Sequence, residues 1–214
     1  MLCRSALLLA SFLGVASGQL LPDSAELHGA LTIVLRSDSA ASPEVLTAMK
    51  SETESLLDPS SIRLAWTTDS DGTQVFDRVA VVHLRGACRV DGPLPGTVQK
   101  NEPLGRTQVV NGKVLPFADV RCNPVRKLIA HDLAFEPSAE REELLGRALG
   151  RVLAHELYHI LLRTTSHGGQ GLARPAQSSS DLLASSDSFA PVDERKLSLL
   201  FRSVATKSFV HAGQ

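Results

Sequence analysis

The sequence is poor in aromatic residues and carries almost no net charge. Of its 214 residues only 4% are aromatic, with a single Trp66 and a single Tyr158. Its 22 basic and 23 acidic residues give a formal net charge of −1. Because nucleic-acid binding surfaces need clustered positive charge and often use aromatic side chains for stacking, we expect no nucleic-acid partner.

Long apolar runs are missing beyond the first twenty residues. Arg4 precedes an uncharged stretch over residues 6–15, which is too short to span a bilayer, and the small residues 16–18 follow. This order is typical of a secretory signal peptide, which we predict over residues 1–18; a buried N-terminal helix is the alternative. We therefore expect a secreted or periplasmic monomer without a stable membrane anchor, with residues 19–214 forming one domain.

Cysteine is scarce as well. Removal of the signal peptide would leave only Cys88 and Cys122. An even number of cysteines in an exported chain predicts a disulfide, so we expect the bond Cys88–Cys122. Closure of such a loop stabilises a fold by roughly 3–4 kcal/mol in the chain-entropy model. Metal ligation by the two thiolates is the less favoured alternative, because neither cysteine lies in a C-x-x-C pair.

Apolar residues make up 43% of the chain, which is sufficient for a core. Short apolar or alternating runs predict strands over residues 31–35, 62–67, 78–84 and 114–120. Pro116 removes a backbone donor from the last of these, so we expect that strand at a sheet edge, where an extended peptide could pair with it. Prolines and glycines predict an irregular or hairpin segment between residues 89 and 114.

Two helices are predicted near the ends of the domain. Ser42, Pro43 and Glu44 form a typical helix start, and the helix should close at Ser60 and Ser61. Its apolar residues at spacings that share one face are Val45, Met49, Leu56 and Leu57. A closing helix is expected over residues 191–201, with Leu197, Leu200 and Phe201 facing inward.

A long, mostly buried helix is predicted from Ser138 to about Arg163, because leucine, alanine and valine recur at helical spacing. It carries the sequence His155-Glu156-Leu157-Tyr158-His159. We expect Tyr158, on another face from its neighbours, to pack into the core. The glycine- and serine-rich stretch over residues 167–188 predicts a loop.

The two histidines of this helix have the spacing of metal ligands. His155 and His159 lie about 40° apart around the helix axis and roughly 6 Å apart along it, so both imidazoles can reach one tetrahedral ion. Glu156, beside the first histidine, is close enough to hold a metal's water without ligating. The motif therefore predicts a zinc site with a catalytic carboxylate; ordinary hydrogen bonding of the three side chains is the alternative. His131, before the helix, is expected to be structural or to line a cleft.

A catalytic zinc ion usually takes a third protein ligand and leaves a fourth position open. On an unbroken helix His167 would lie about 12 Å beyond His159, so the chain must turn back after Arg163. Four extended residues span up to about 13 Å, which allows His167 to return to the metal. His167 is thus our candidate third ligand. Asp181 and Glu194 are the next candidates, and a surface-loop histidine is the other interpretation of residue 167.

The motif resembles that of the zincin metallopeptidases, and most closely that of the metzincins, including archaemetzincin-like members. The resemblance covers the order of elements over most of the mature chain. It implies an α+β fold in which a small mixed sheet packs on a long active-site helix and a C-terminal helix closes the domain. It also implies zinc ligands at His155 and His159 and the catalytic carboxylate at Glu156.

The chain departs from the metzincin pattern H-E-x-x-H-x-x-G-x-x-H after the second histidine. Leu162 stands at the glycine position and Thr165 at the third-ligand position, so His167 requires a turn that is two residues longer. The methionine of the family's Met-turn is also missing, with Leu182 or Leu183 near its expected place.

The combined prediction is a secreted metallopeptidase with one catalytic zinc ion. It would hydrolyse peptide or protein substrates with a water molecule activated by Glu156. Two other classes stay open: a secreted zinc-binding or interaction protein with a degenerate protease fold and no activity, and a purely structural exported domain that binds no metal.

Overall fold

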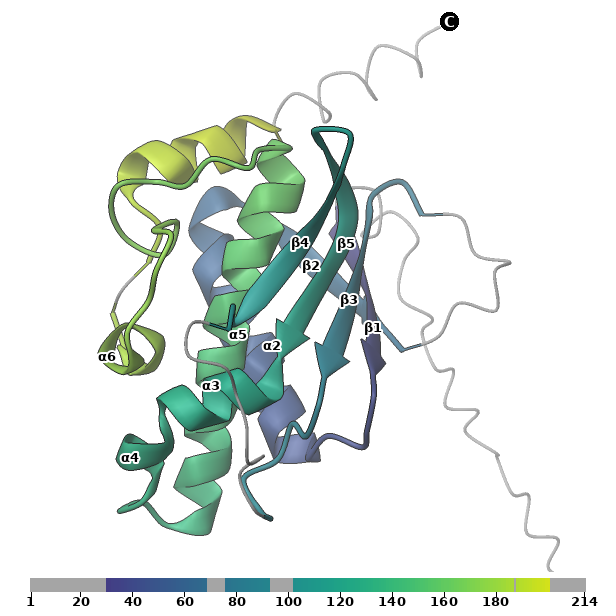
Figure 1. Cartoon of the computed structure of the whole chain (residues 1–214). Coiled ribbons are helices and arrows are strands. Elements are labelled where there is room, and N and C mark those ends of the chain that lie inside the picture. The colour runs from purple at the N-terminus through teal and green to yellow at the C-terminus, as the bar shows by residue number, and fades with distance from the viewer. Residues whose placement is uncertain (1–29, 69–75, 93–101, 187, 201–214) are drawn as a thin grey trace, which may run out of the picture.

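The computed structural model describes residues 30–68, 76–92, 102–186 and 188–200, so the predicted signal peptide and Phe201 lie outside the described residues. A five-stranded mixed sheet packs against helices (Figure 1). Its strands lie in the order β2 (Arg63–Thr67), β1 (Ala30–Ser37), β3 (Val79–Arg85), β5 (Lys113–Arg121) and β4 (Gly105–Val110). The first four are parallel and β4 is antiparallel to β5. The α+β class predicted from the sequence is confirmed.

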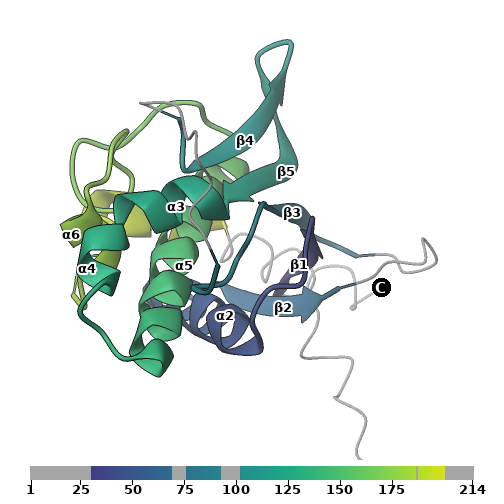
Figure 2. The same ribbon diagram turned by 60° about the horizontal axis from the view of Figure 1, so that its bottom comes forward.

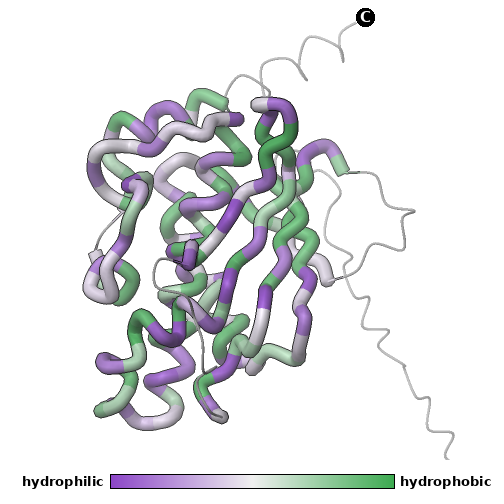
Figure 3. The backbone as a smooth tube through the Cα atoms, in the orientation of Figure 1, coloured by the Kyte–Doolittle hydropathy of each residue, from purple (hydrophilic) through white to green (hydrophobic). Residues whose placement is uncertain are grey.

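Two long helices form the layer beside the sheet. They are α2 (Pro43–Leu57) and α5 (Ser138–Leu162), and they lie side by side in both views (Figures 1 and 2). Hydrophobic and hydrophilic residues are interspersed along the helices (Figure 3), as expected for helices that bury one face. In β1, residues 30–35 are all buried, whereas in β3 alternate residues, among them Ala80 and Val82, are fully buried in the core.

The crossing of α2 and α5 depends on two glycines. A Cβ atom on Gly146 would lie 2.6 Å from the carbonyl oxygen of Val45, and one on Gly150 would lie 2.7 Å from that of Met49. The two backbones therefore approach more closely than any larger residue allows. On α2, Ser42 is the N-cap and the predicted apolar face is buried, as expected from the sequence. A short 3₁₀ turn (Asp58–Ser60) follows this helix.

The prediction of an edge strand over residues 114–120 is wrong. That segment is β5, which lies between β3 and β4, and the edge strands of the sheet are β4 and β2. Pro116 is tolerated inside the sheet because pairing with β3 begins only at Phe117. On its other side β5 pairs with β4, and the register of this pairing shifts between Thr107 and Val109. The shift lies opposite the part of β5 that contains Pro116. The hairpin predicted in the preceding segment is formed by β4, which pairs antiparallel with β5. Residues 93–101 lie outside the described residues.

Three short helices were not predicted: α3 (Cys122–Leu128), α4 (Ala130–Leu133) and α6 (Ser179–Leu183). The last interrupts the segment expected to be a loop. The closing helix is present over residues 191–200. Its Leu197 is fully buried as predicted, but Leu200 is 36% exposed, so its predicted inward orientation is wrong.

The predicted disulfide is present. Cys88 and Cys122 are joined with their Cα atoms 5.0 Å apart, and both are fully buried. The bond ties the segment after β3 to the first residue of α3. None of the helices within the described residues is long and apolar enough to cross a membrane.

Candidate metal site

Three histidines converge at the end of α5. The ligand nitrogens of His155, His159 and His167 all lie within 4.8 Å of one another. The Nε2 atoms of His155 and His159 are 3.1 Å apart. The ring of His167 lies 5.3 Å from that of His155 and 4.7 Å from that of His159, measured between ring centroids. The three residues proposed from the sequence as ligands therefore lie together.

A left-handed residue ends α5 and turns the chain back. Arg163 has a φ of 50°, and its N–H bonds to the carbonyl oxygens of the preceding turn. Further on, the N–H of Gly168 donates to the carbonyl of Ala173 over 2.8 Å, which closes the turn behind His167. A Cβ atom on Gly168 would lie 2.7 Å from Oδ2 of Asp193, so this close approach also requires glycine.

Backbone carbonyls fix the orientation of both helix histidines. Nδ1 of His155 lies 2.8 Å from the carbonyl oxygen of Leu172, and Nδ1 of His159 lies 2.8 Å from that of Thr164. A carbonyl oxygen only accepts hydrogen bonds, so Nδ1 carries the proton in both rings. Each neutral imidazole then presents the lone pair of Nε2 to the other, as in histidines that bind metal.

This donor set fits a metal ion. Two Nε2 lone pairs facing each other at 3.1 Å repel unless a cation lies between them. In a tetrahedral site with metal–nitrogen distances of 2.0–2.1 Å, the nitrogens lie about 3.3–3.4 Å apart. Burial also lowers the pKa of His155 and of His159, which favours the neutral form that binds metal. Imidazole ligands suit zinc, copper, iron and nickel.

Glu156 lies beside the histidines in a nearly closed environment. Its exposed fraction is 6%. The hydroxyl of Thr107, on β4, donates to its Oε2 atom over 2.6 Å. Burial raises the pKa of the Glu156 carboxyl, and the hydrogen bond from Thr107 partly opposes this rise. A carboxyl group with a raised pKa beside a metal site suits proton transfer near neutral pH.

A cleft of about 1180 Å³ opens over these residues. Its walls are one side of α3, the edge strand β4 with the residues just before it, one face of α5 and the segment that follows that helix. The lining is mixed. Apolar side chains come from Leu104, Val109, Val114, Leu128 and Val152, and charged ones from Glu102, Arg106, Lys127 and Arg174.

The alternative third ligands serve other purposes. Asp181 closes a capping box with Ser178 at the start of α6 and pairs with Arg174 over 2.8 Å. Glu194 lies in the closing helix, where its backbone carbonyl accepts a hydrogen bond from Ser60. Neither belongs to the histidine group.

Tyr158 and His131 lie away from the cleft lining. Tyr158 is 3% exposed, stacks on Phe189 and donates its hydroxyl to Asp193, so its predicted core position is confirmed. His131 is exposed on α4, where it contacts Phe135 edge to face. It does not line the cleft described above.

Thr107 and the two carbonyl groups were missed at the level of sequence. Residues 107 and 172 belong to segments without a clear spacing pattern relative to α5. Only the folded chain brings them to the motif. A histidine that binds metal usually donates a hydrogen bond from its other ring nitrogen. This general rule predicts that an acceptor is present but does not identify the residue that supplies it.

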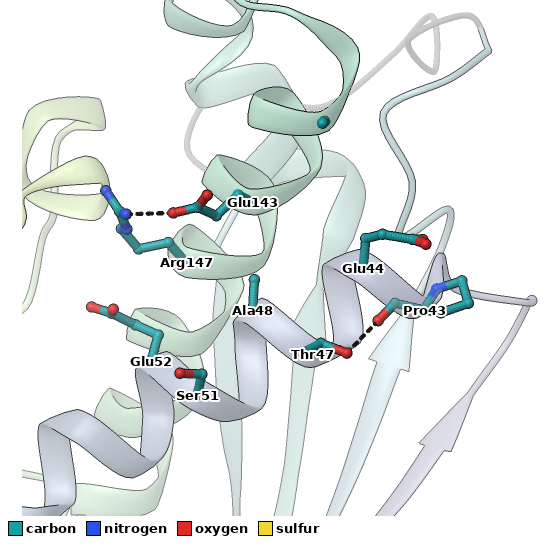
Figure 4. A pocket seen from close by; sticks show the side chains of 9 residues that line it. Pro43, Glu44, Thr47, Ala48, Ser51, Glu52, Glu143 and Arg147 are labelled. Carbon is teal, nitrogen blue, oxygen red and sulfur yellow. Dashed lines mark hydrogen bonds and ion pairs between the residues drawn. The ribbon is translucent and has the colours of Figure 1, made fainter.

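A second, smaller hollow of about 520 Å³ lies where α2 crosses α5 (Figure 4). Of its three carboxylates, Glu44 accepts a hydrogen bond from the hydroxyl of Ser42, and the other two have cationic partners. Glu143 accepts from Arg147 over 2.9 Å, and Glu52 accepts from Arg151 over 2.8 Å. We therefore assign no site to it.

Comparison of the chain with protein-family models, curated proteins and solved structures found no match.

Proposed function

We propose that this protein is a secreted zinc-dependent metallopeptidase with a zincin-like fold. The observation that carries the proposal is the convergence of three histidines beside a buried glutamate, in one cleft. A glutamate that directly follows the first of two histidines spaced four apart on a helix is the pattern of zinc peptidases, which favours zinc among the metals that imidazole binds.

The residues that would hold the metal are His155, His159 and His167, the first two through Nε2. When bound, a zinc ion lowers the pKa of a water molecule in its open position and polarises the carbonyl of the scissile bond. The carbonyls of Leu172 and Thr164 keep the two rings in the tautomer that ligates.

Glu156 would act as the general base. Its Oε2 atom is held by Thr107, so Oε1 is the atom that would take the proton of the attacking water. The same carboxyl would then pass this proton to the leaving amine. Burial raises the pKa of Glu156, which makes its carboxylate a stronger base than an exposed glutamate.

A peptide is the substrate that this cleft suits best. The edge strand β4 forms one wall, and its outer side pairs with no other strand among the described residues. An extended peptide can bind such an edge through backbone hydrogen bonds. The length of this edge, from Gly105 to Val110, favours cleavage within a chain over removal of a terminal residue.

The metal proposal is tested by elemental analysis of the purified protein, with about one equivalent of zinc expected. The peptidase proposal is tested with a mixed peptide library, where we expect cleavage that a chelator abolishes and zinc restores. Glu156→Gln should keep its zinc and lose nearly all turnover. Zinc without cleavage would favour the non-catalytic alternative, and absence of any bound metal would contradict both.

Export is tested separately. We expect the N-terminus of the mature protein to be Gln19, as determined by N-terminal sequencing of material from the medium or periplasm. A protein that retains Met1 would contradict secretion without bearing on the metal site.

A further inference from the structure

We propose that the edge strand β4 positions the general base: Thr107 anchors one oxygen of Glu156, and Gly105 leaves the space that the other oxygen occupies. This inference rests on the proposed peptidase function. It assigns a positioning role to two residues that the motif does not include.

The contact with Thr107 is short and specific. Its hydroxyl lies 2.6 Å from Oε2 of Glu156 and 3.2 Å from the backbone carbonyl of the same residue. A hydroxyl has a single proton, and the shorter contact to a charged acceptor is the stronger hydrogen bond. The proton therefore points to the carboxylate and fixes the position of Oε2.

Gly105 contacts the opposite side of the carboxylate. A Cβ atom at residue 105 would lie 2.5 Å from Oε1 of Glu156 and 2.8 Å from Cγ1 of Val152. Such distances are far inside van der Waals contact, so the carboxylate occupies the place of the missing side chain. Glu156 is held at two points by residues two apart on one strand, because positions two apart face the same side of the sheet.

In this arrangement one strand both binds the substrate and positions Glu156, the proposed general base. The strand that holds Glu156 is also the edge strand beside the cleft, and its outer side pairs with no other strand in the described part of the sheet. The distance between the general base and a peptide bound along β4 is then set by a single rigid element. A displacement of about 1 Å in a catalytic group can cost 100-fold in rate, so this positioning matters for turnover.

The first test compares Thr107→Val, which has nearly the same shape but no hydroxyl, with Thr107→Ser, which keeps the hydroxyl. We expect Thr107→Val to lower kcat by about 10- to 100-fold while KM and zinc content stay within about twofold. Thr107→Ser should keep kcat within about threefold of wild type. Thr47→Val is the matched control, because it removes the hydroxyl of an exposed threonine of α2 that does not line the cleft.

The second test does not depend on activity. In the metal-free protein, Thr107→Val should lower the urea midpoint of unfolding in the wild-type background and have a much smaller effect in the Glu156→Ala background. This double-mutant cycle tests the contact between Thr107 and Glu156 without any measurement of activity. A wild type that cleaves no peptide would therefore refute only the peptidase function.

Any of the following results would overturn the inference. One is a kcat within threefold of wild type for Thr107→Val. Another is an equal loss of kcat for the valine and serine variants, and a further one is a loss of zinc in Thr107→Val. The last is an effect of Thr107→Val on the urea midpoint that is the same in the Glu156→Ala background as in wild type.

Discussion

Nδ1 of His155 lies 2.8 Å from the carbonyl oxygen of Leu172, a residue of the same turn that carries His167. The carbonyl of Thr164, at the start of this turn, accepts from His159 in the same way. One segment therefore supplies the third histidine of the candidate metal site and the hydrogen-bond partners of the other two. A change that disturbs the structure of this turn should therefore also lower the affinity for metal.

His167→Ala should reduce zinc affinity by more than about 100-fold, because loss of a direct ligand costs more than the 10- to 100-fold typical of an outer partner. Competition with a chromophoric chelator measures this. Asp181→Ala and Glu194→Gln are the comparison variants, and both should keep the wild-type affinity. If either of them weakens zinc binding more than His167→Ala does, the third ligand has been assigned to the wrong residue.

The pH dependence of α6 follows from Asp181. The N–H of Ser178, its hydroxyl and Arg174 lower the pKa of this carboxyl from 3.8 to about 2. A pKa that is lower in the folded state stabilises the fold above pH 3.8, and this contribution is lost as the pH falls towards about 2. We expect the urea midpoint of the wild type to exceed that of Asp181→Asn near neutral pH, and the difference to shrink in acid and vanish only below about pH 2. A difference that persists unchanged in acid would contradict this.

The features that sequence predicted well depend on local spacing. The histidines of α5 are four residues apart, so the geometry of one helix brings them together whatever the rest of the chain does. The end of that helix at Arg163 and the buried face of α2 follow from similarly local patterns. The parallel strands also have the apolar runs typical of buried sheets.

The features that sequence missed depend on which segments become neighbours. Pro116 suggested an edge strand, but the order of strands is set by tertiary packing, and a local shift in register accommodates the proline within the sheet. Thr107 gives no signal of its own, because nothing in its surroundings indicates that it lies 2.6 Å from Glu156. Leu200 fits the helical spacing, yet the packing of the described residues leaves it partly exposed.

The glycines at the crossing of α2 and α5 make a prediction about stability. Gly150→Ala should lower the free energy of unfolding by about 1–3 kcal/mol, because the new methyl group must push the two backbones apart. This loss should exceed the gain of up to about 1 kcal/mol that alanine brings to a helix. Gly169→Ala is the control, since a Cβ atom there meets no atom within 4 Å. Equal urea midpoints for the two variants would show that the close approach is dispensable.

The disulfide should contribute strongly to stability. Cys88 and Cys122 are 34 residues apart, and closure of a loop of this length stabilises a fold by about 3–4 kcal/mol in the chain-entropy model. The double variant Cys88→Ser/Cys122→Ser should therefore unfold at a much lower urea concentration than the oxidised wild type. The reduced wild type should resemble the variant. A midpoint that is insensitive to reductant would mean that the bond does not form in the purified protein.

Gly105→Ala tests the other side of the contact that holds Glu156. The added methyl group would lie 2.5 Å from Oε1, so the carboxylate must move, while the histidines keep their carbonyl partners. We expect kcat to fall by about 10- to 100-fold with zinc affinity unchanged. Glu156→Asp shortens the side chain by one methylene group and makes room for that methyl group. In the Glu156→Asp background the further loss caused by Gly105→Ala should therefore be several-fold smaller than in wild type. Independent, multiplicative losses in kcat would mean that residues 105 and 156 do not compete for the same space.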